Sequence, residues 1–311
     1  MIAFLARRGI RLLLTVWLAL TIVFVALRAL PGDAISVQLS QSGATAAQIA
    51  ARQTALGLDQ PLSMQYAALW ADLLHGSLGR SLLSMRPVSA ILAEQWGATV
   101  QLATAAAIVA VLVGSGAGLL AGLAPRRIIR VLAMAFIALI AASPVYWTGT
   151  LAIWIFGVWL KVLPSAGSSG WQQLVLPAAT LGLAAAGAIG QVTATTVRAQ
   201  RQADYVRTAR AKGLRPGRIL YAHLLRPVMT PILTVIGLQF GFLLGGAAIT
   251  EALFVRQGLG QILLNAINTR DYPVVQGVVM LAAILFSVVN SSVDIVASLL
   301  DPRLAITPDA R

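Results

Sequence analysis

The chain has 311 residues, of which 58% are hydrophobic and 11% are charged, and its mean hydropathy is +0.83. A soluble domain of this length could not bury so much apolar surface, so the composition excludes a soluble globule and indicates a polytopic membrane protein. The net charge of +13 could suit nucleic acid, but the charges lie between long uncharged runs, which argues against a nucleic-acid partner. The absence of cysteine excludes disulfides and thiolate metal or redox chemistry.

Six uncharged runs are long enough to cross a bilayer, which takes about 20 apolar residues per helix. They predict spans at about 9–30, 97–123, 131–159, 172–197, 229–253 and 274–299. The chain is thereby divided into a first transmembrane helix (1–30), an external helical subdomain (31–96) and a five-helix core (97–311) that contains a basic loop at 198–231. The first run is short, but Arg11 and Arg28 can extend to the two interfaces. It is longer than the apolar run of a signal peptide and lacks a small-x-small cleavage site, so we expect an uncleaved span.

Lysine and arginine are distributed unevenly between the two sides that these spans define. Seven of the 23 fall on one side and the remaining 16 on the other. The seven are Arg28, Arg52, Arg80, Arg86, Lys161, Arg256 and Arg270. Because cytoplasmic segments carry the excess of positive charge, both termini are expected in the cytoplasm. The two histidines, His75 and His223, then lie on opposite sides of the membrane and cannot share a metal ion.

The external segment is predicted to contain two helices. Residues 45–56 form the first, which Gly57 follows, and residues 63–74 form the second, which Ser63 caps and which ends near Gly76. Their apolar residues indicate a small subdomain that packs against another surface rather than a solvated spacer.

Small residues recur every four positions in three of the predicted spans, where they allow close helix packing. They are Gly114, Gly118 and Gly122, then Gly182, Ala186 and Gly190, then Gly237, Gly241 and Gly245. In the third span, Ser143-Pro144 interrupts the apolar run, because proline has no N–H to donate and frees a carbonyl. We interpret this site as a bend rather than a gate hinge.

The segment 203–231 is strongly basic and lies between two predicted spans. Asp204 is predicted to cap a helix over 205–212, and Gly213 stands at the left-handed position that ends a helix. Arg215-Pro216-Gly217 predicts a turn, and a second helix is expected over about 218–226.

The two short helices of this segment are predicted to be amphipathic. The apolar side is predicted to carry Tyr205, Ala209, Leu214, Ile219, Leu220 and Leu224, with the arginines turned away. Such a unit is suited to docking on a partner. The alternative is that its charges only fix membrane topology.

The chain shows no residue pattern for its own chemistry. Ionisable groups near the spans are limited to Glu251 and Asp294, each close to a predicted end, so no buried acidic relay for a secondary carrier is predicted. No catalytic constellation is present. A phosphate-binding loop needs Gly directly before Lys, but Lys161 and Lys212 follow Leu160 and Ala211. Any ATP-driven motor must therefore be another polypeptide.

At this point the motifs resemble one family, the inner-membrane permeases of ABC importers for dipeptides, oligopeptides and nickel. DYVRTARAKGL at 204–214 resembles the family's cytoplasmic EAA loop, with Arg207-Thr208-Ala209 at the EAA positions and Gly213 as the fixed glycine. Further matches are LPGD at 30–33, GLDQPL at 57–62, GSLGRS at 76–81, EALF at 251–254, GLG at 258–260, RDYPVVQG at 270–277 and DPR at 301–303. Two departures are Arg256-Gln257 before GLG, where Trp-Pro is more usual, and Pro227, where the family often has a polar residue.

The resemblance implies an all-α, type I ABC importer permease with six transmembrane helices and a small helical external subdomain. It implies a second homologous permease, two ABC ATPase subunits, an extracytoplasmic solute-binding protein and a surrounding lipid bilayer. ATP and Mg would bind the ATPase subunits, and this chain would bind no cofactor or metal. The coupling residues implied are Asp204, Tyr205, Arg207, Thr208, Ala209, Arg210, Lys212 and Gly213. The candidates for the external mouth are Glu251, Asn265, Asn268 and Asp271.

Several alternatives remain open at the level of sequence. Di- or oligopeptides are the substrate class favoured, but nickel and metal-chelate permeases share these motifs. A secondary carrier would need a buried coupling residue, a passive channel would conduct without an ATPase, and a membrane enzyme would turn over a substrate alone.

Overall fold

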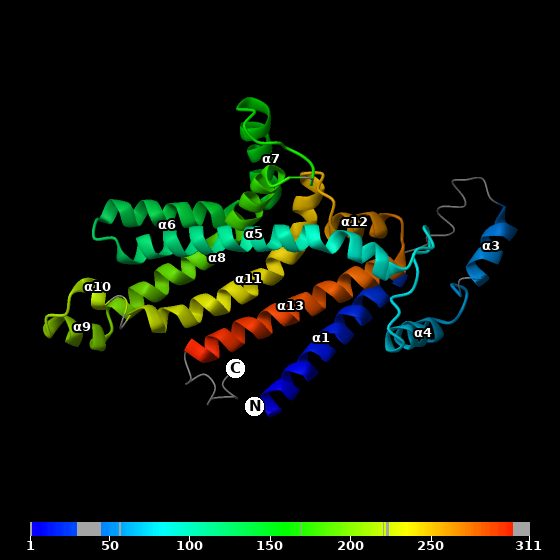
Figure 1. Cartoon of the computed structure of the whole chain (residues 1–311), viewed down its shortest axis with the longest axis horizontal. Helices are drawn as coiled ribbons and strands as arrows, with labels where there is room; N and C mark the ends of the chain where they lie inside the picture. Colours follow the sequence, from blue (N-terminus) through cyan, green and yellow to red (C-terminus); the bar gives the residue numbers. More distant parts are fainter. Residues whose placement is uncertain are drawn as a thin grey trace. The chain divides into compact units, whose positions relative to one another are not determined.

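The computed structural model describes residues 2–29, 45–55, 57–168, 170–219, 221 and 224–300. Within these ranges the regular structure is helical, with one isolated β-bridge between Arg80 and Pro87 (Figure 1). Five helices are long and apolar enough to span a membrane, and a bent pair gives a sixth span if it is counted as one. The all-α architecture is thus confirmed, and the six predicted spans correspond to these five helices and the bent pair.

The chain forms two compact units. The first comprises residues 1–99 and 257–287, and the second comprises residues 100–256 and 288–311. Two long helices, α5 (Val88–Leu123) and α13 (Tyr272–Leu300), contribute to both units.

The first unit also contains α1 (Ile2–Ala29), α3 (Ala46–Ala55), α4 (Leu62–Leu74) and α12 (Leu259–Asn268). Helix α4 packs on α1 through an edge-to-face contact of Tyr66 with Phe24, and the Tyr66 hydroxyl shares a 2.8 Å hydrogen bond with Thr21. Arg28 Nε donates to Gln65 Oε1 at 3.0 Å. Tyr66 of α4 thus packs against another surface as expected, whereas Met64 of the same helix is 56% exposed.

The start of α4 differs from the prediction. The helix begins directly after Pro61, whose φ of −53° and ψ of 143° make it the N-cap, and no side chain forms a capping hydrogen bond. The assignment of Ser63 as the cap is wrong, because Ser63 is already the second helical residue. The predicted end is confirmed, since Gly76 has a φ of +75° directly after the C-cap His75.

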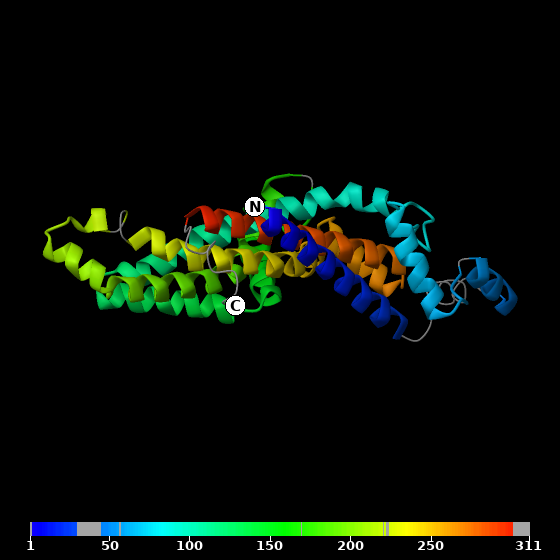
Figure 2. The same ribbon diagram turned by 90° about the horizontal axis from the view of Figure 1, so that it is seen from below.

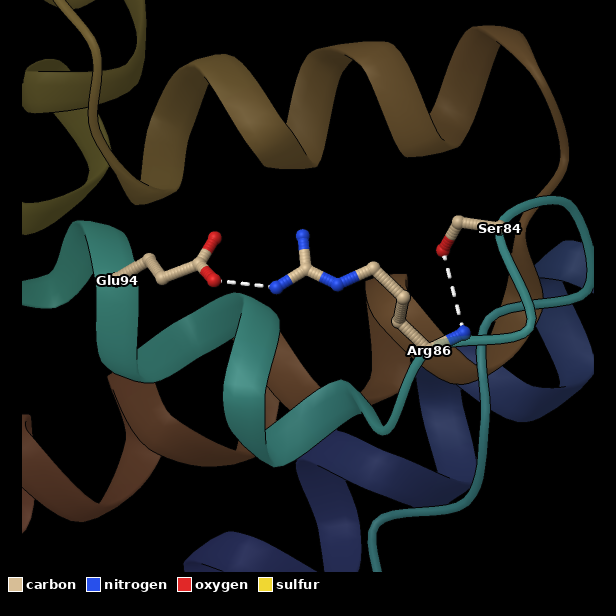
Figure 3. A network of polar contacts seen from close by, with 3 residues as sticks. All are labelled: Ser84, Arg86 and Glu94. Carbon is tan, nitrogen blue, oxygen red and sulfur yellow. Dashed lines mark hydrogen bonds and ion pairs between the residues drawn. The ribbon is translucent and has the colours of Figure 1, made fainter.

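Helix α5 begins at Val88, earlier than the span predicted from 97. The turn before it is held by local polar contacts: Ser84 Oγ accepts a 3.5 Å hydrogen bond from Arg86 N, and the Arg86 guanidinium pairs with Glu94 eight residues later (Figure 3). About half of each charged side chain is exposed, so water screens the pair and its contribution to stability is small.

The second unit contains α6 (Arg127–Ala142), α7 (Val145–Ala152), the π-helical turn η1 (Ile153–Trp159), α8 (Gln172–Arg201) and α11 (Leu225–Leu253). The predicted third span is not one helix, because α6 and α7 meet at an angle of 103°. Ser143 is extended with a ψ of 122°, the conformation that a following proline enforces, and Pro144 is the extended N-cap of α7.

Two of the predicted glycine stripes lie at a close contact between helices α5 and α8. A Cβ added at Gly118 of α5 would come within 2.5 Å of Thr193 Cβ and 2.7 Å of Gly190 O, both on α8. Additions at Gly114 and Gly122 would also clash with α8, at 2.6 Å in each case. Packing through these two stripes is confirmed. The stripe of α11 is only partly used, since a Cβ at Gly245 would meet no described atom within 4 Å.

Candidate coupling surface and outer-face residues

Two short helices, α9 (Asp204–Ala211) and α10 (Pro216–Ile219), follow the end of α8. Both views show them beside the ends of α8 and α11 (Figures 1 and 2). The N-cap of α9 is Ala203, in the extended conformation, and no side chain caps it. The prediction that Asp204 is the cap is therefore wrong. Asp204 is the first helical residue, where its negative charge favours the positive end of the helix dipole.

The end of α9 follows the prediction. Gly213 has a φ of +75°, a region that glycine occupies without strain. Its N–H donates to Arg210 O at 2.9 Å, and the N–H of Leu214 donates to Ala209 O at 3.2 Å. These two hydrogen bonds make a Schellman motif, which satisfies carbonyls at the helix end. The short helix is thus closed by defined backbone geometry.

One side of α9 belongs to the core of the second unit. Val206 is 0% exposed and Ala209 6% exposed, and both join a cluster that includes Ile219 and Leu224. Tyr205 was placed on this apolar side by the prediction, but it is 42% exposed, and Val206 takes that position instead. Hence the buried side of α9 is occupied by its own chain.

The opposite side of α9 is exposed and carries three basic side chains, those of Arg207, Arg210 and Lys212. We call it the coupling surface and define it by Asp204, Tyr205, Arg207, Thr208, Arg210, Lys212 and Gly213, all of which are exposed. Arg207 Nη1 lies 3.7 Å from Asp204 Oδ1, but both side chains are more than three-quarters exposed, so this pair leaves Arg207 accessible. The Tyr205 hydroxyl donates to Gln200 Oε1 at 2.6 Å, and partial burial raises the pKa of the phenol.

Helix α10 differs from the predicted second helix. Pro216 is its first residue, where the missing N–H costs nothing, so Arg215-Pro216-Gly217 opens a helix rather than forming a separate turn. Leu220 and His223, within the predicted helix, lie outside the described residues. The basic side chains Arg215 and Arg218 are exposed and extend the positive charge beside α9.

Arg201 fixes the base of this region. Its Nη1 donates to the carbonyl oxygens of Gly122 at 2.8 Å and Leu123 at 3.2 Å, the last two residues of α5. A cation at the carboxyl end of a helix is stabilised by the helix dipole. The guanidinium thereby links the end of α8, from which α9 continues, to the end of α5.

The four candidates for the external mouth differ in exposure. Asn265 and Asn268 on α12 are exposed, whereas Glu251 is 0% and Asp271 4% exposed. Asp271 accepts hydrogen bonds from Ser81 Oγ at 2.5 Å and from the backbone N–H of Leu82 at 3.1 Å. A buried carboxylate held by two donors is suited to fixing a loop. In this conformation it is not accessible to a solute.

Glu251 lies in the last turn of α11, near the buried Arg256. Burial lowers the pKa of the Arg256 guanidinium, and the charge of Glu251 opposes this shift. Arg256 Nη2 also donates to Gln101 Oε1 at 3.5 Å.

The contacts of Gln101 with Arg256 and of Ser81 with Asp271 were not predicted from the sequence. Ser81 could have been found as the last residue of the GSLGRS motif, and Arg256 had been noted only as a departure from the family.

These helices and the basic loop define a multi-pass membrane protein of the permease class. Residues 114–306 match the family model described as binding-protein-dependent transport system inner membrane component, and residues 1–103 match the N-terminal model of the same system. The chain belongs to this family, so it is an inner-membrane permease subunit of an ABC importer. Its family works with a partner ATPase and a solute-binding protein.

Relatives of known name align with nearly the whole chain. The chain is 36% identical over 304 residues to the glutathione transport system permease protein GsiC of Salmonella paratyphi A, covering 98% of this chain and 99% of the relative. It is 34% identical over the same length to GsiC of Escherichia coli strain K12. Among solved structures, an inward-facing form of the MetNI methionine ABC transporter matches with a TM-score of 0.56 at 17% identity, over 67% of this chain and 95% of that one. This last likeness concerns the fold alone.

Proposed function

We propose that this chain forms half of a pathway that carries di- or oligopeptides across the cytoplasmic membrane. A second, homologous permease forms the other half, and both termini lie in the cytoplasm. The relatives named as glutathione permeases support the substrate class, because glutathione is a tripeptide. The excess of lysine and arginine on the side that carries α9 supports the orientation.

The observation that carries the coupling role is the two-sided structure of α9. Val206 and Ala209 anchor one side in the core, while the other side presents Arg207, Arg210 and Lys212 to a partner. A helix anchored in this way transmits the movement of a partner to the spans. Two ATPase subunits each receive one such helix, bind ATP and Mg, and hydrolyse the nucleotide, while this chain binds neither. Opposite charge on the ATPase would accelerate docking and fix its register.

On the outer side, the external subdomain and α12 form the platform for the solute-binding protein. Asn265 and Asn268 are the exposed polar groups of α12 that such a protein can contact. Asp271 and Glu251 support this side from within.

The composition of the complex is the first test. The chain is crosslinked in its native membrane, isolated in mild detergent and analysed by mass spectrometry. A second permease, one or two ATPases and a solute-binding protein are expected. Recovery of the chain alone, or as a homo-oligomer without ATPase, would overturn the coupling proposal and favour a carrier or a channel.

The substrate class is tested by uptake in proteoliposomes that contain the complex. Labelled trialanine and Ni²⁺ are compared, each with ATP inside or outside the vesicles. ATP-dependent uptake of trialanine supports the proposal, whereas uptake of Ni²⁺ alone would assign the nickel alternative.

The coupling surface is tested with charge reversal. Arg207→Glu is expected to lower solute-stimulated ATP hydrolysis, and Arg198→Glu, an exposed residue of α8 outside the coupling surface, is the matched control. Gly213→Trp adds a bulky side chain at a φ of +75° and is expected to uncouple the complex. Transport at the wild-type rate by an assembled Gly213→Trp complex would contradict the role of this surface.

A further inference from the structure

A cavity of about 400 Å³ lies at the break between α6 and α7. We call it the bend cavity. Its walls come from the break itself, from Ala188 and Gln191 of α8, and from Gln239 and Phe242 of α11. All of these belong to the second unit. The volume falls within the range of about 300–1,000 Å³ that is typical of small-ligand sites.

The two glutamines set the polarity of this cavity. Both lie well inside helices that are long enough to span the membrane. Gln191 is exposed and Gln239 half-buried, and neither side-chain amide hydrogen-bonds to another described residue. An amide that faced lipid without a partner would cost several kcal/mol. The surface that both glutamines line therefore contacts water, a solute or a partner subunit rather than hydrocarbon.

The broken helix adds a second set of polar groups. Pro144 cannot donate a backbone hydrogen bond, and α7 turns away by 103°, so α7 donates no backbone hydrogen bond to the last carbonyls of α6 within the described chain. Ala141 and Ala142, which carry two of these carbonyls, line the cavity. Non-helical backbone at membrane depth is stable only inside protein or beside a water-filled cavity. The end of α6 also carries a partial negative charge.

These groups match one chemical class. A glutamine side chain offers both a donor and an acceptor, which is what a peptide group requires. The carbonyl end of α6 favours N–H donors or an ammonium group. No charged side chain is among the described residues that line the cavity, so the site has no charged group with which to select the charge of a peptide side chain.

We infer that the bend cavity binds the backbone of the transported peptide, with Gln191 and Gln239 as specificity-determining residues. This inference rests on the proposed function and assigns its substrate contact within the membrane. Phe242 and Ala188 supply an apolar wall that accepts different peptide side chains.

Cysteine accessibility tests the inference directly, since the chain contains no cysteine. Gln191→Cys and Gln239→Cys are made in the full complex in proteoliposomes and treated with a water-soluble cationic methanethiosulfonate, and the mass of this chain is measured. Leu132→Cys, on the exposed apolar side of α6, is the control and is expected to stay unlabelled. Both glutamine positions are expected to label, and trialanine at ten times its half-saturating concentration is expected to slow labelling about tenfold.

The outcomes separate the two proposals. If the two cysteines are labelled and trialanine does not slow the reaction, the peptide site is overturned. If they are not labelled, the inference is also overturned, and the side of α8 and α11 that carries Gln191 and Gln239 is assigned to contact with a partner subunit. If the wild-type complex hydrolyses ATP but takes up no trialanine, the proposed function fails and this inference with it. Wild-type uptake together with unprotected or unlabelled cysteines overturns this inference alone.

Transport kinetics give a second measurement. Gln191→Met and Gln239→Met are each expected to raise the half-saturating trialanine concentration about tenfold, the effect of losing one hydrogen bond to a desolvated group. Gln172→Met, at the exposed start of the same helix α8, is expected to leave it unchanged. If the glutamine variants do not assemble, Ala188→Leu provides the test, because leucine fills the bend cavity while both glutamine amides remain. This variant is also expected to raise the half-saturating trialanine concentration. Wild-type kinetics in Ala188→Leu would overturn the inference.

Discussion

Ser81 and Asp271 lie 190 residues apart in the sequence and are joined by a buried hydrogen bond from the serine hydroxyl to the carboxylate. The second carboxylate oxygen accepts the N–H of Leu82, and Ser81 Oγ in turn accepts from the N–H groups of Leu83 and Ser84. The turn before α5 is therefore held to the start of α13. Within the first unit, this contact fixes the segment that joins the external helices to the spans.

Asp271→Ala should destabilise this connection. The change leaves the Ser81 hydroxyl and the Leu82 N–H without their partner in a buried site, at a cost of about 1–3 kcal/mol for each unsatisfied group. The melting temperature in detergent, followed by tryptophan fluorescence, should fall. Asn268→Ala removes an exposed polar side chain nearby and should change stability by less than about 0.5 kcal/mol. Equal melting temperatures for the two variants would show that the contact does not hold the turn.

Substitutions at Gly213 should rank by their tolerance of positive φ. A Cβ here meets no described atom within 4 Å, so the backbone angle of +75° alone sets the cost. Non-glycine residues pay about 1–2 kcal/mol in this region, with asparagine the best tolerated. We expect solute-stimulated ATP hydrolysis to decrease in the order Gly213→Asn, Gly213→Ala, Gly213→Val. Higher activity in Gly213→Ala than in Gly213→Asn would indicate that side-chain volume at the ATPase, rather than helix termination, governs coupling, because alanine is the smaller residue but tolerates the positive φ less well.

Much of the fold follows from local sequence signals. Long uncharged runs gave the spans, and the helix stop at Gly213 was predicted because glycine alone adopts its backbone angle without strain. The start of α5 is earlier than the predicted start of the span at 97, because the charge of Glu94 interrupts the uncharged run from which the span is predicted. In the structure Glu94 is helical and pairs with the exposed Arg86, so its charge does not oppose the helix.

The finer features depend on contacts that no local pattern contains. Helix α9 has only eight residues, and the sequence does not indicate which of its sides faces the core. A rotation of the helix by one residue about its axis places Val206 rather than Tyr205 on the buried side. The contact between Ser81 and Asp271 joins two motifs that had each been noticed, but nothing in either indicates its partner. Burial then distinguishes Asp271 from Asn268, although both are polar residues of one external segment.

Arg201→Ala should loosen the base of the coupling region. The guanidinium donates to two carbonyls at the end of α5, and hydrogen bonds from charged donors contribute about 1.5–3 kcal/mol each. Hydrogen exchange in α9 should accelerate, because the end of α8 that carries it loses its link to α5. Arg198→Ala, an exposed arginine one turn earlier, should leave exchange unchanged. Similar exchange in the two variants would mean that the apolar contacts of Val206 and Ala209 hold α9 without Arg201.

Two glycines of α5 provide a matched pair for testing the packing of the second unit. A Cβ at Gly118 would come within 2.5 Å of Thr193 Cβ and 2.7 Å of Gly190 O, so α5 and α8 would have to separate, whereas a Cβ at Gly116 meets no described atom within 4 Å. Gly118→Ala should cost about 1–3 kcal/mol through overpacking. Gly116→Ala should be neutral or slightly stabilising, because alanine favours the helix by up to about 1 kcal/mol.

The yield of folded complex and its melting temperature in detergent compare the two variants under identical conditions. A lower melting temperature for Gly118→Ala alone would show that the close approach of α5 and α8 exists in the membrane-extracted protein. If Gly116→Ala were the more damaging change, that side of α5 would have to face a partner subunit, since the chain itself leaves space there. The pair therefore distinguishes packing within the chain from packing between permease subunits.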